Sequence, residues 1–247
     1  MIQEFTEFFR CYRLLSNQLS KEDLLKYTVL FQKVDDIIQL GLKEEEIKTT
    51  NYSVFQILNV EKYEDETHTP FLSDLLNLHG QHYQKDLFYK LFIEHIFLNE
   101  IERERFLPTN PLFFNIINQK GVYTDFGQGF LDIFIDYTDI GRKSFSIVIE
   151  NKIYHGDGDD QLNKYISYLE SLFRDNILLV YLTLSGKPPE SNSMKHERVK
   201  ELEGKGKLKL VSYHRDIHSI LIKSLPLIKS EKVMNTILQY LTVINSL

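Results

Sequence analysis

The chain has 247 residues, of which 35 are acidic and 29 basic, so its formal net charge is −6. Hydrophobic residues make up 43% and charged residues 26%, the balance of an ordinary globular protein that is long enough to bury a sizeable core. This mild acidity excludes a chain that coats nucleic acid through bulk positive charge.

Cysteine usage and hydropathy predict the compartment. Cys11 is the one cysteine in the sequence, so an internal disulfide cannot form and a structural zinc site is not expected. Apolar runs stay well short of the roughly 18 residues that a membrane span requires. The N-terminal sequence MIQEFTEFFR lacks the basic-then-apolar order of a signal peptide. We therefore expect a cytoplasmic protein without a membrane partner.

Helical spacing dominates the first hundred residues. The pattern predicts a helical extension over residues 1–50, with its apolar residues at Phe5, Phe8, Phe9, Tyr12, Leu24, Leu25, Val29, Phe31 and Val34. Core packing explains most of these side chains, but the extension also offers a route to a homo-oligomer or a protein partner. Two further helices are predicted, one with Thr69 as N-cap and Pro70 at its first position, the other from Tyr83 to about Arg105.

Beyond Pro108 and Pro111 the pattern changes to short β-rich segments. A polar loop over 185–206 is expected to be mobile, and two helices end the chain. The order predicts a central mixed β-sheet flanked by helices over residues 51–247, because a strand–helix–strand unit of this length favours a parallel pair. The predicted strands are 130–137, 145–152, 177–184 and 207–213, with a hairpin turn at 139–142 and helices at 159–174, 215–224 and 230–245.

Three charged residues of the first two strands carry the chemistry. Because side chains alternate along a strand, Glu150 and Lys152 share one face, while Asn151 points to the other. The preceding run Ile147-Val148-Ile149 is typical of a buried central strand. Asp132 lies among apolar residues, where a lone carboxylate is costly. If the two strands form a hairpin, two carboxylates and an ammonium group converge on one point.

Two adjacent carboxylates repel each other unless a proton or a cation lies between them. Mg²⁺ suits such a pair, because it takes oxygen ligands and keeps several waters. A lysine beside the metal can orient the attacking water and neutralise charge on a phosphate. The residues therefore match metal-assisted phosphodiester hydrolysis. The alternative is that Asp132 belongs to an edge strand and that Glu150 and Lys152 form an exposed ion pair, since such spacing also arises by chance.

The ordered set GFLDIFID, SIVIENKI and DQLNKY resembles the PD-(D/E)XK nuclease superfamily. The Glu150-Asn151-Lys152 motif and the pair Gln161-x-x-x-Tyr165 resemble one bacterial branch in particular. The upstream segment ETHTPFL at 66–72 and the downstream segments YLTLSG and VSY are similar to landmarks of that branch. The resemblance covers roughly residues 52 to 225. Leu131 stands where the commoner pattern has a proline.

The resemblance implies a restriction-endonuclease-like core and a metal-dependent nuclease using Mg²⁺ or Mn²⁺. It implies Asp132, Glu150 and the backbone carbonyl of Asn151 as metal ligands, and Lys152 as the catalytic lysine. Glu66 would contact the metal directly or through water.

The same resemblance places Gln161 and Tyr165 beside the metal site, where they help to position the lysine or the nucleic acid. They lie four residues apart and are therefore neighbours on one helix face. The competing interpretation is that Gln161 caps the helix and Tyr165 packs its ring.

Other charged segments give weaker indications. Lys187 and Lys195 belong to a locally basic stretch that can meet phosphates, although interspersed charges favour a solvated surface. The acidic loop at 156–160 is expected to be solvated and flexible. DNA is the expected substrate, but the sequence leaves RNA, and endo- or exonuclease action, open. A catalytically inactive module that binds nucleic acid or a protein partner is the alternative function.

Overall fold

The computed structural model describes residues 28–38 and 52–247. The chain divides into two compact units, Met1–Tyr52 and Ser53–Leu247. Residues 28–38 of the first unit are helical. Cys11 and the remainder of the predicted helical extension lie outside the described residues. Among the described helices, none is long and apolar enough to cross a membrane.

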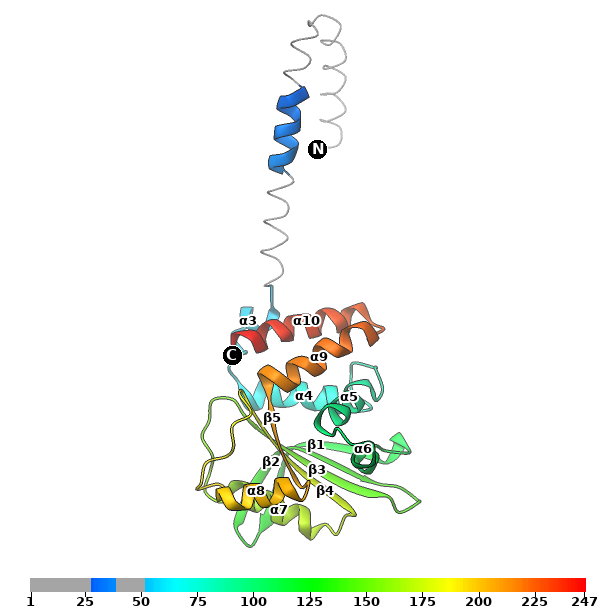
Figure 1. Cartoon of the computed structure of the whole chain (residues 1–247), viewed down its shortest axis with the longest axis vertical. Coiled ribbons are helices and arrows are strands. Elements are labelled where there is room, and N and C mark those ends of the chain that lie inside the picture. Colours follow the sequence, from blue (N-terminus) through cyan, green and yellow to red (C-terminus); the bar gives the residue numbers. More distant parts are fainter. Residues whose placement is uncertain (1–27, 39–51) are drawn as a thin grey trace, which may run out of the picture. The chain divides into compact units, whose positions relative to one another are not determined.

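A five-stranded mixed sheet forms the centre of the second unit (Figure 1). Its spatial order is β1-β2-β3-β4-β5; the first three strands are antiparallel, and β3, β4 and β5 are parallel. The predicted mixed sheet is therefore confirmed. The strands span Phe114–Thr124 (β1), Gly127–Thr138 (β2), Ser144–Lys152 (β3), Asn176–Thr183 (β4) and Leu208–Ser212 (β5).

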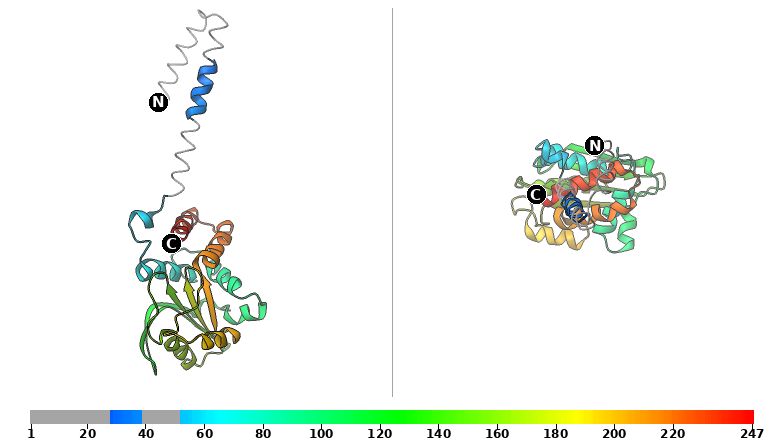
Figure 2. Two further views of the ribbon diagram at one scale, coloured as in Figure 1. Left: turned by 60° about the vertical axis from the view of Figure 1, so that its left-hand side comes forward. Right: turned by 90° about the horizontal axis from the view of Figure 1, so that it is seen from above.

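Helices cover both faces of this sheet (Figures 1 and 2). One face carries α7 (Gln161–Ser171) and α8 (His196–Gly204). The opposite face carries α4 (Thr69–Leu76), α5 (Leu87–Ile96), α9 (His218–Ser224) and α10 (Glu231–Ser246). Shorter elements are α3 (Val54–Ile57), α6 (Glu100–Phe106), the π-helical turns η1 (Glu64–His68) and η3 (Tyr213–Ile217), and the 3₁₀ turns η2 (Pro111–Phe113) and η4 (Leu225–Leu227).

Strand β3 separates two apolar cores. Phe145, Ile147 and Ile149 face the α4 side, whereas Val148 packs with Leu162 on the α7 side. A strand covered by helices on both faces needs apolar residues at every position, which explains the continuous run in the sequence. The β3–α7–β4 crossover and the β2–β3 hairpin turn are as predicted.

Strand β1 has no counterpart among the predicted strands. It is an edge strand, paired with β2 alone, and Phe114 and Val122 are its buried residues. Its middle contains Gln119, Lys120 and Gly121, so neither an apolar run nor a strict alternation marks it. Gln119 also has a positive φ of 50°, which interrupts the regular pleat.

Two helix predictions are wrong in detail. The helix predicted from Tyr83 to Arg105 is two helices, because the side chain of Asn99 accepts a hydrogen bond from the Ile101 N–H and starts α6 anew. Thr69 does not cap α4, since the chain is already helical from Glu64.

The segment predicted as a mobile loop at 185–206 contains α8. Val199 and Leu202 of this helix are buried against the sheet, on the α7 side. Its short amphipathic pattern is masked by the surrounding charged residues.

We expect Ile147→Ala to lower the free energy of unfolding by about 2–5 kcal/mol, because Ile147 is fully buried in the central strand and the truncation leaves a cavity. Ile140→Ala is the matched control: Ile140 is 87% exposed in the β2–β3 turn and its truncation is expected to change stability by less than about 0.5 kcal/mol. Equal effects in urea denaturation would contradict this account of the core.

Candidate active site

Asp132 and Glu150 lie together at the end of the β2–β3 ladder. The last paired residues are Ile133 and Ile149, so the next residue on each strand is a carboxylate. Asp132 is 7% exposed and Glu150 is fully buried. Burial raises the pKa of Asp132 to about 6. Burial, reinforced by the charge of Asp132, raises the pKa of Glu150 well above its ordinary value.

The hydrogen bonds of Glu150 leave one oxygen free among the described residues. Its Oε1 accepts from Gln161 Nε2 at 2.6 Å and lies 3.0 Å from Lys152 Nζ. Its Oε2 is buried without a hydrogen-bond partner from this part of the chain. Asp132 Oδ2 accepts from the N–H of Asn151 at 2.8 Å. Because a buried acceptor without a donor is costly, Oε2 suits either a proton or a cation.

Lys152 supplies positive charge beside this pair. Burial by itself would lower the pKa of Lys152, but the carboxylates of Glu150 and Asp132 outweigh it, and the pKa lies above its ordinary value. The side chain is 13% exposed, so the ammonium group reaches an opening while its stem is covered. In this arrangement Lys152 is a cation rather than a base.

Gln161 and Tyr165 join α7 to both carboxylate-bearing strands. Gln161 Nε2 donates to Tyr165 Oη at 2.9 Å as well as to Glu150, and Gln161 Oε1 accepts from the N–H of Gly158. Tyr165 Oη donates to the carbonyl of Phe130 at 2.7 Å. The ring of Tyr165 is buried in the core, so the residue combines packing with a hydroxyl at the site.

Glu66 does not lie with these residues. It lines a separate hollow with Pro70 and Phe71. Glu64 and Asp65, from the same turn, face the Asp132 side instead. Consecutive side chains of a helical turn point in different directions, so a run of three acidic residues does not reveal which one faces the site.

Glu64 holds the backbone that follows β3. It is 4% exposed, and its Oε2 accepts hydrogen bonds from the N–H groups of Ile153 and Tyr154. Its Oε1 lies 3.5 Å from His155 Nδ1. These contacts fix the chain immediately after Lys152.

Asn151 faces away from the opening, as predicted. Its Nδ2 donates to Thr69 Oγ1 at 3.0 Å, and its Oδ1 accepts from Tyr213 Oη at 2.8 Å. This side chain is therefore structural, and the metal-binding role of its backbone carbonyl stays a prediction.

The acidic loop at 156–160 is tied down rather than free. Asp157 Oδ1 accepts from Tyr181 Oη at 2.8 Å, and its Oδ2 accepts from the Glu190 N–H at 2.7 Å. Lys187 and Lys195 do not line the hollow beside Asp132.

A hollow of about 370 Å³ opens above Asp132 and Lys152. Gln119 spans part of it, with Nε2 placed 3.4 Å from Asp65 Oδ1 and 3.3 Å from Asp132 Oδ1. The sequence analysis did not predict Gln119, because it did not predict strand β1. Lys164 was not predicted either, but its spacing of three residues from Gln161 places both side chains on the same face of α7. The lining residues are Glu64, Asp65, Gln119, Gln128, Gly129, Phe130, Asp132, Lys152, His155, Gly158, Gln161, Lys164 and Tyr165.

The donor set fits a cation that needs few protein ligands. Within residues 28–38 and 52–247, no three His, Cys, Asp or Glu side chains gather as a metal-binding cluster. Mg²⁺ commonly takes one or two carboxylates and completes its shell with water and phosphate oxygens. Asp132 and the free oxygen of Glu150 match that requirement, whereas a zinc site would need more nitrogen or sulfur ligands.

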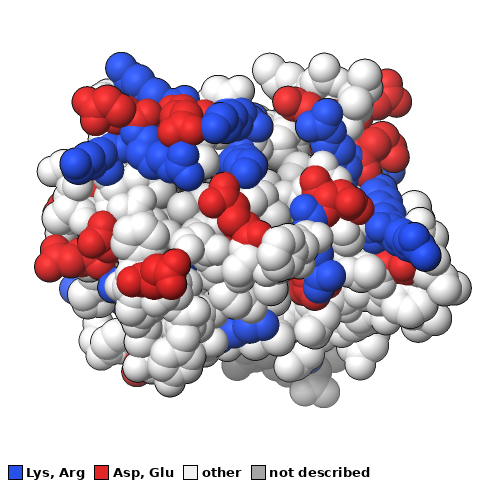
Figure 3. Space-filling view, turned by 90° about the horizontal axis from the view of Figure 1, so that it is seen from below, with Lys and Arg blue, Asp and Glu red and all other residues white. Residues whose placement is uncertain are grey.

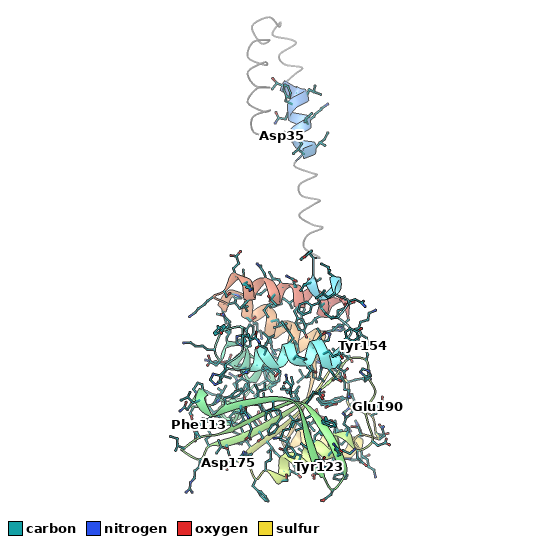
Figure 4. The ribbon with its side chains drawn as sticks, turned by 180° about the vertical axis from the view of Figure 1, so that it is seen from behind. Asp35, Phe113, Tyr123, Tyr154, Asp175 and Glu190 are labelled. Carbon is teal, nitrogen blue, oxygen red and sulfur yellow. The ribbon has the colours of Figure 1, made fainter. Side chains whose placement is uncertain are left out.

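A larger hollow, of about 660 Å³, lies at the opposite end of the sheet. Two cations that line it form ion pairs: Arg174 with Asp136, and Lys207 with Glu170. Figure 4 labels Phe113 and Asp175 at this end, and Tyr154 and Glu190 at the end that carries Lys152.

Comparison with known families agrees with this geometry. The family model of the PD-(D/E)XK nuclease superfamily matches residues 52–242. The chain therefore belongs to the PD-(D/E)XK nuclease superfamily, and its mixed sheet flanked by helices is a restriction-endonuclease-like core. No curated protein and no solved structure matches the chain. The narrower resemblance to one bacterial branch stays a prediction.

We expect Glu150→Gln to stabilise the metal-free protein at neutral pH. The substitution removes a buried charge, keeps an oxygen for Lys152 and Gln161, and lets an amide N–H₂ replace the unpartnered oxygen beside Asp132. Burial raises the pKa of Glu150 well above its ordinary value, so the wild type loses stability at neutral pH that the variant keeps, and a gain of at least about 1 kcal/mol in the free energy of unfolding is expected.

The gain has a defined pH dependence. A carboxyl whose pKa is raised by folding costs no stability below its unfolded pKa, and the cost grows as pH rises through its folded pKa. The advantage of Glu150→Gln is therefore expected to vanish near pH 4, to grow as the pH rises above that value, and to reach its full size once the pH passes the raised pKa of Glu150. Urea denaturation in EDTA measures it, with Glu203→Gln as a surface control; a lower stability of Glu150→Gln at neutral pH would refute the buried-charge account.

Proposed function

We propose that this protein is a Mg²⁺-dependent nuclease that hydrolyses phosphodiester bonds in DNA. The observation that carries the proposal is the buried Asp132–Glu150 pair, with one carboxylate oxygen free among the described residues and the ammonium group of Lys152 beside it. A pair so arranged favours a divalent cation, and an open hollow above it gives access to a substrate.

Asp132 and Glu150, with the carbonyl of Asn151, would hold the metal. A bound Mg²⁺ would lower the pKa of a coordinated water and offset negative charge on the phosphate. Glu66 has no part in this proposal, because it lines another hollow. Asp65 replaces it as the acidic residue from the first helical region, since Gln119 links Asp65 to Asp132.

The other residues of the site would position the metal ligand Glu150 and neutralise the phosphates of the substrate. Lys152 stays protonated beside Glu150, so its ammonium group can donate to a phosphate oxygen as negative charge develops. Gln161 holds Glu150 by its Oε1, which leaves Oε2 for the metal. Lys164 and His155 on the rim of the hollow are placed to meet flanking phosphates.

Charge distribution supports a modest, salt-sensitive affinity for DNA. The face in Figure 3 intersperses basic with acidic side chains instead of forming one wide basic field. With a net charge of −6, attraction to phosphate would depend on the metal and on the few cations at the hollow. The reducing, cytoplasmic environment inferred from Cys11 is compatible with such an enzyme.

We expect Lys152→Ala and Asp132→Ala each to reduce cleavage of plasmid or linear DNA in Mg²⁺ or Mn²⁺ by on the order of 10²-fold or more. The first removes a cation that would offset negative charge in the transition state, and the second removes a ligand of the proposed metal. Lys200→Ala, an exposed change on α8, is the matched control and should retain activity. DNA cleavage that persists unchanged in both site variants would contradict the proposal that this site is the nuclease active site.

Metal binding has its own readout. At a Mn²⁺ concentration of about 100 Kd, linkage adds roughly 2.7 kcal/mol to the wild type, which corresponds to a Tm rise of about 5–10 °C for a domain of this size. Glu150→Gln should lose this rise because a neutral amide replaces a ligand. The rise should be larger at pH 8 than at pH 5, because protons compete for the carboxylates whose pKa is raised.

The inactive alternative gives a different pair of results. A module that keeps the fold for binding alone would show no cleavage in any metal, whether or not Mn²⁺ raises its Tm. Cleavage measured on a folded preparation in Mn²⁺ therefore separates an active nuclease from an inactive one, and the Tm shift shows whether the inactive module still binds the metal.

A further inference from the structure

Exposed aromatic rings surround the end of the β1–β2 hairpin. Tyr123 is 79% exposed, Phe126 is 49% exposed and Phe130 is 54% exposed. The ladder continues to the pair Thr124–Gly127, so the rings project from regular hairpin structure. Strands β1 and β3 are both antiparallel to β2 and therefore run in the same direction, so the last residues of β1 lie at the same end of the sheet as Lys152. Figure 4 labels Tyr123 near the free end of this hairpin.

The hairpin does not need these rings for its own packing. Val122 and Leu131 fill the space against α7 and are almost fully buried. Phe130 has a fixed place instead: it pairs across the strands with Gly121, and a Cβ at Gly121 would lie 3.5 Å from its ring. The ring therefore lies over a position without a side chain, with its exposed surface toward solvent.

Phe130 also belongs to the hollow above the carboxylates. It lines that hollow together with Asp132 and Lys152, and its carbonyl accepts from Tyr165 Oη. An aromatic surface is thus continuous with the proposed reaction site, rather than scattered over the protein.

A cationic side chain lies against the α7 side of the same hairpin. Lys164 runs along the hairpin, with its methylene carbons 3.7 to 3.9 Å from where a Cβ on Gly129 or Gly127 would lie. Asp125, in the turn, is the opposing charge on the hairpin end. Lys164 lies on the α7 side of the hairpin, whereas Phe130 and Tyr123 face the other side. A cation on one side of a hairpin and exposed rings on the other can contact the phosphates and the unpaired bases of one strand of nucleic acid.

We propose that Tyr123, Phe126 and Phe130 form a base-stacking surface, and that the substrate presents unpaired bases there: a single strand, or a duplex with a frayed or flapped end. This inference rests on the proposed nuclease function. Bases inside a duplex are already stacked on their neighbours, so they offer no face to these rings. Unpaired bases do, and stacking tolerates any sequence because every base has a π-face.

Binding without cleavage tests the surface directly. Anisotropy of a fluorescein-labelled single strand and of the matched duplex, both in EDTA, compares wild type with Phe130→Ser and with the double variant Tyr123→Ser/Phe126→Ser. We expect the single-strand affinity to fall by roughly tenfold in each, in line with the loss of stacked bases, and duplex affinity by less than about twofold. Phe130→Trp should keep single-strand binding.

Phe173→Ser is the matched control, because Phe173 is 93% exposed and precedes β4 at the opposite end of the sheet. Unchanged single-strand affinity in the hairpin variants, equal losses for duplex and single strand, or no single-strand binding by the wild type would overturn the proposal. So would a change of oligomeric state in the same variants by light scattering, which would assign the rings to contact with a second copy.

Cleavage in Mn²⁺ separates this inference from the proposed function. If wild type cleaves DNA and the hairpin variants keep its preference between single strand and duplex, the stacking surface fails alone. If no DNA is cleaved but the variants lose single-strand binding in EDTA, the proposed function fails and the stacking surface stands.

Discussion

The burial of two carboxylates at one point is the constraint that organises this end of the molecule. Asp132 and Glu150 each lose most of their hydration, and each makes the other harder to ionise. Partners surround them accordingly: the N–H of Asn151, the ammonium group of Lys152 and the amide of Gln161. An oxygen of Glu150 is nevertheless left without a partner in the described chain, which is costly in a structure that stabilises itself alone and useful in one that binds a cation.

Hydrogen bonds fix the C-terminal end of β3 on the side opposite to its charged side chains. Asn151 ties the strand to Thr69 of α4 and to Tyr213 after β5. Glu64 binds the next two backbone N–H groups. Since successive residues of a strand face opposite sides, one short motif supplies both the charged face and its anchor. Fixing charged groups before the substrate arrives is the main way in which proteins stabilise a transition state electrostatically.

Local patterns were sufficient for the part of the site on β2, β3 and α7. Alternation places Glu150 opposite to Asn151, and helical spacing makes Gln161 and Tyr165 neighbours; both relations depend on a few consecutive residues. Residues brought in by tertiary packing were not accessible in this way. Which residue of the acidic run Glu64–Glu66 faces the site depends on the phase of a π-helical turn.

The remaining errors share a physical cause. β1 is an edge strand with a polar middle, and its pairing with β2, rather than its own apolar pattern, makes it a strand. α8 is short, and its two buried side chains are separated by charged residues that a sequence reader assigns to a loop. In both segments, contacts with the sheet override a weak local preference, so tertiary packing decides whether the segment is a helix or a strand.

A net charge of −6 first suggested a protein unsuited to nucleic acid, and the structure shows where part of that acidity lies. Glu64, Asp65 and Asp132 line one hollow and Glu150 is buried beside Asp132, so a bound divalent cation would reverse the local field where a phosphate has to enter. Electrostatic attraction of the nucleic-acid phosphates would then be confined to one end of the sheet. Affinity beyond that point has to come from contacts that do not depend on charge, and the exposed rings beside the hollow are of that kind.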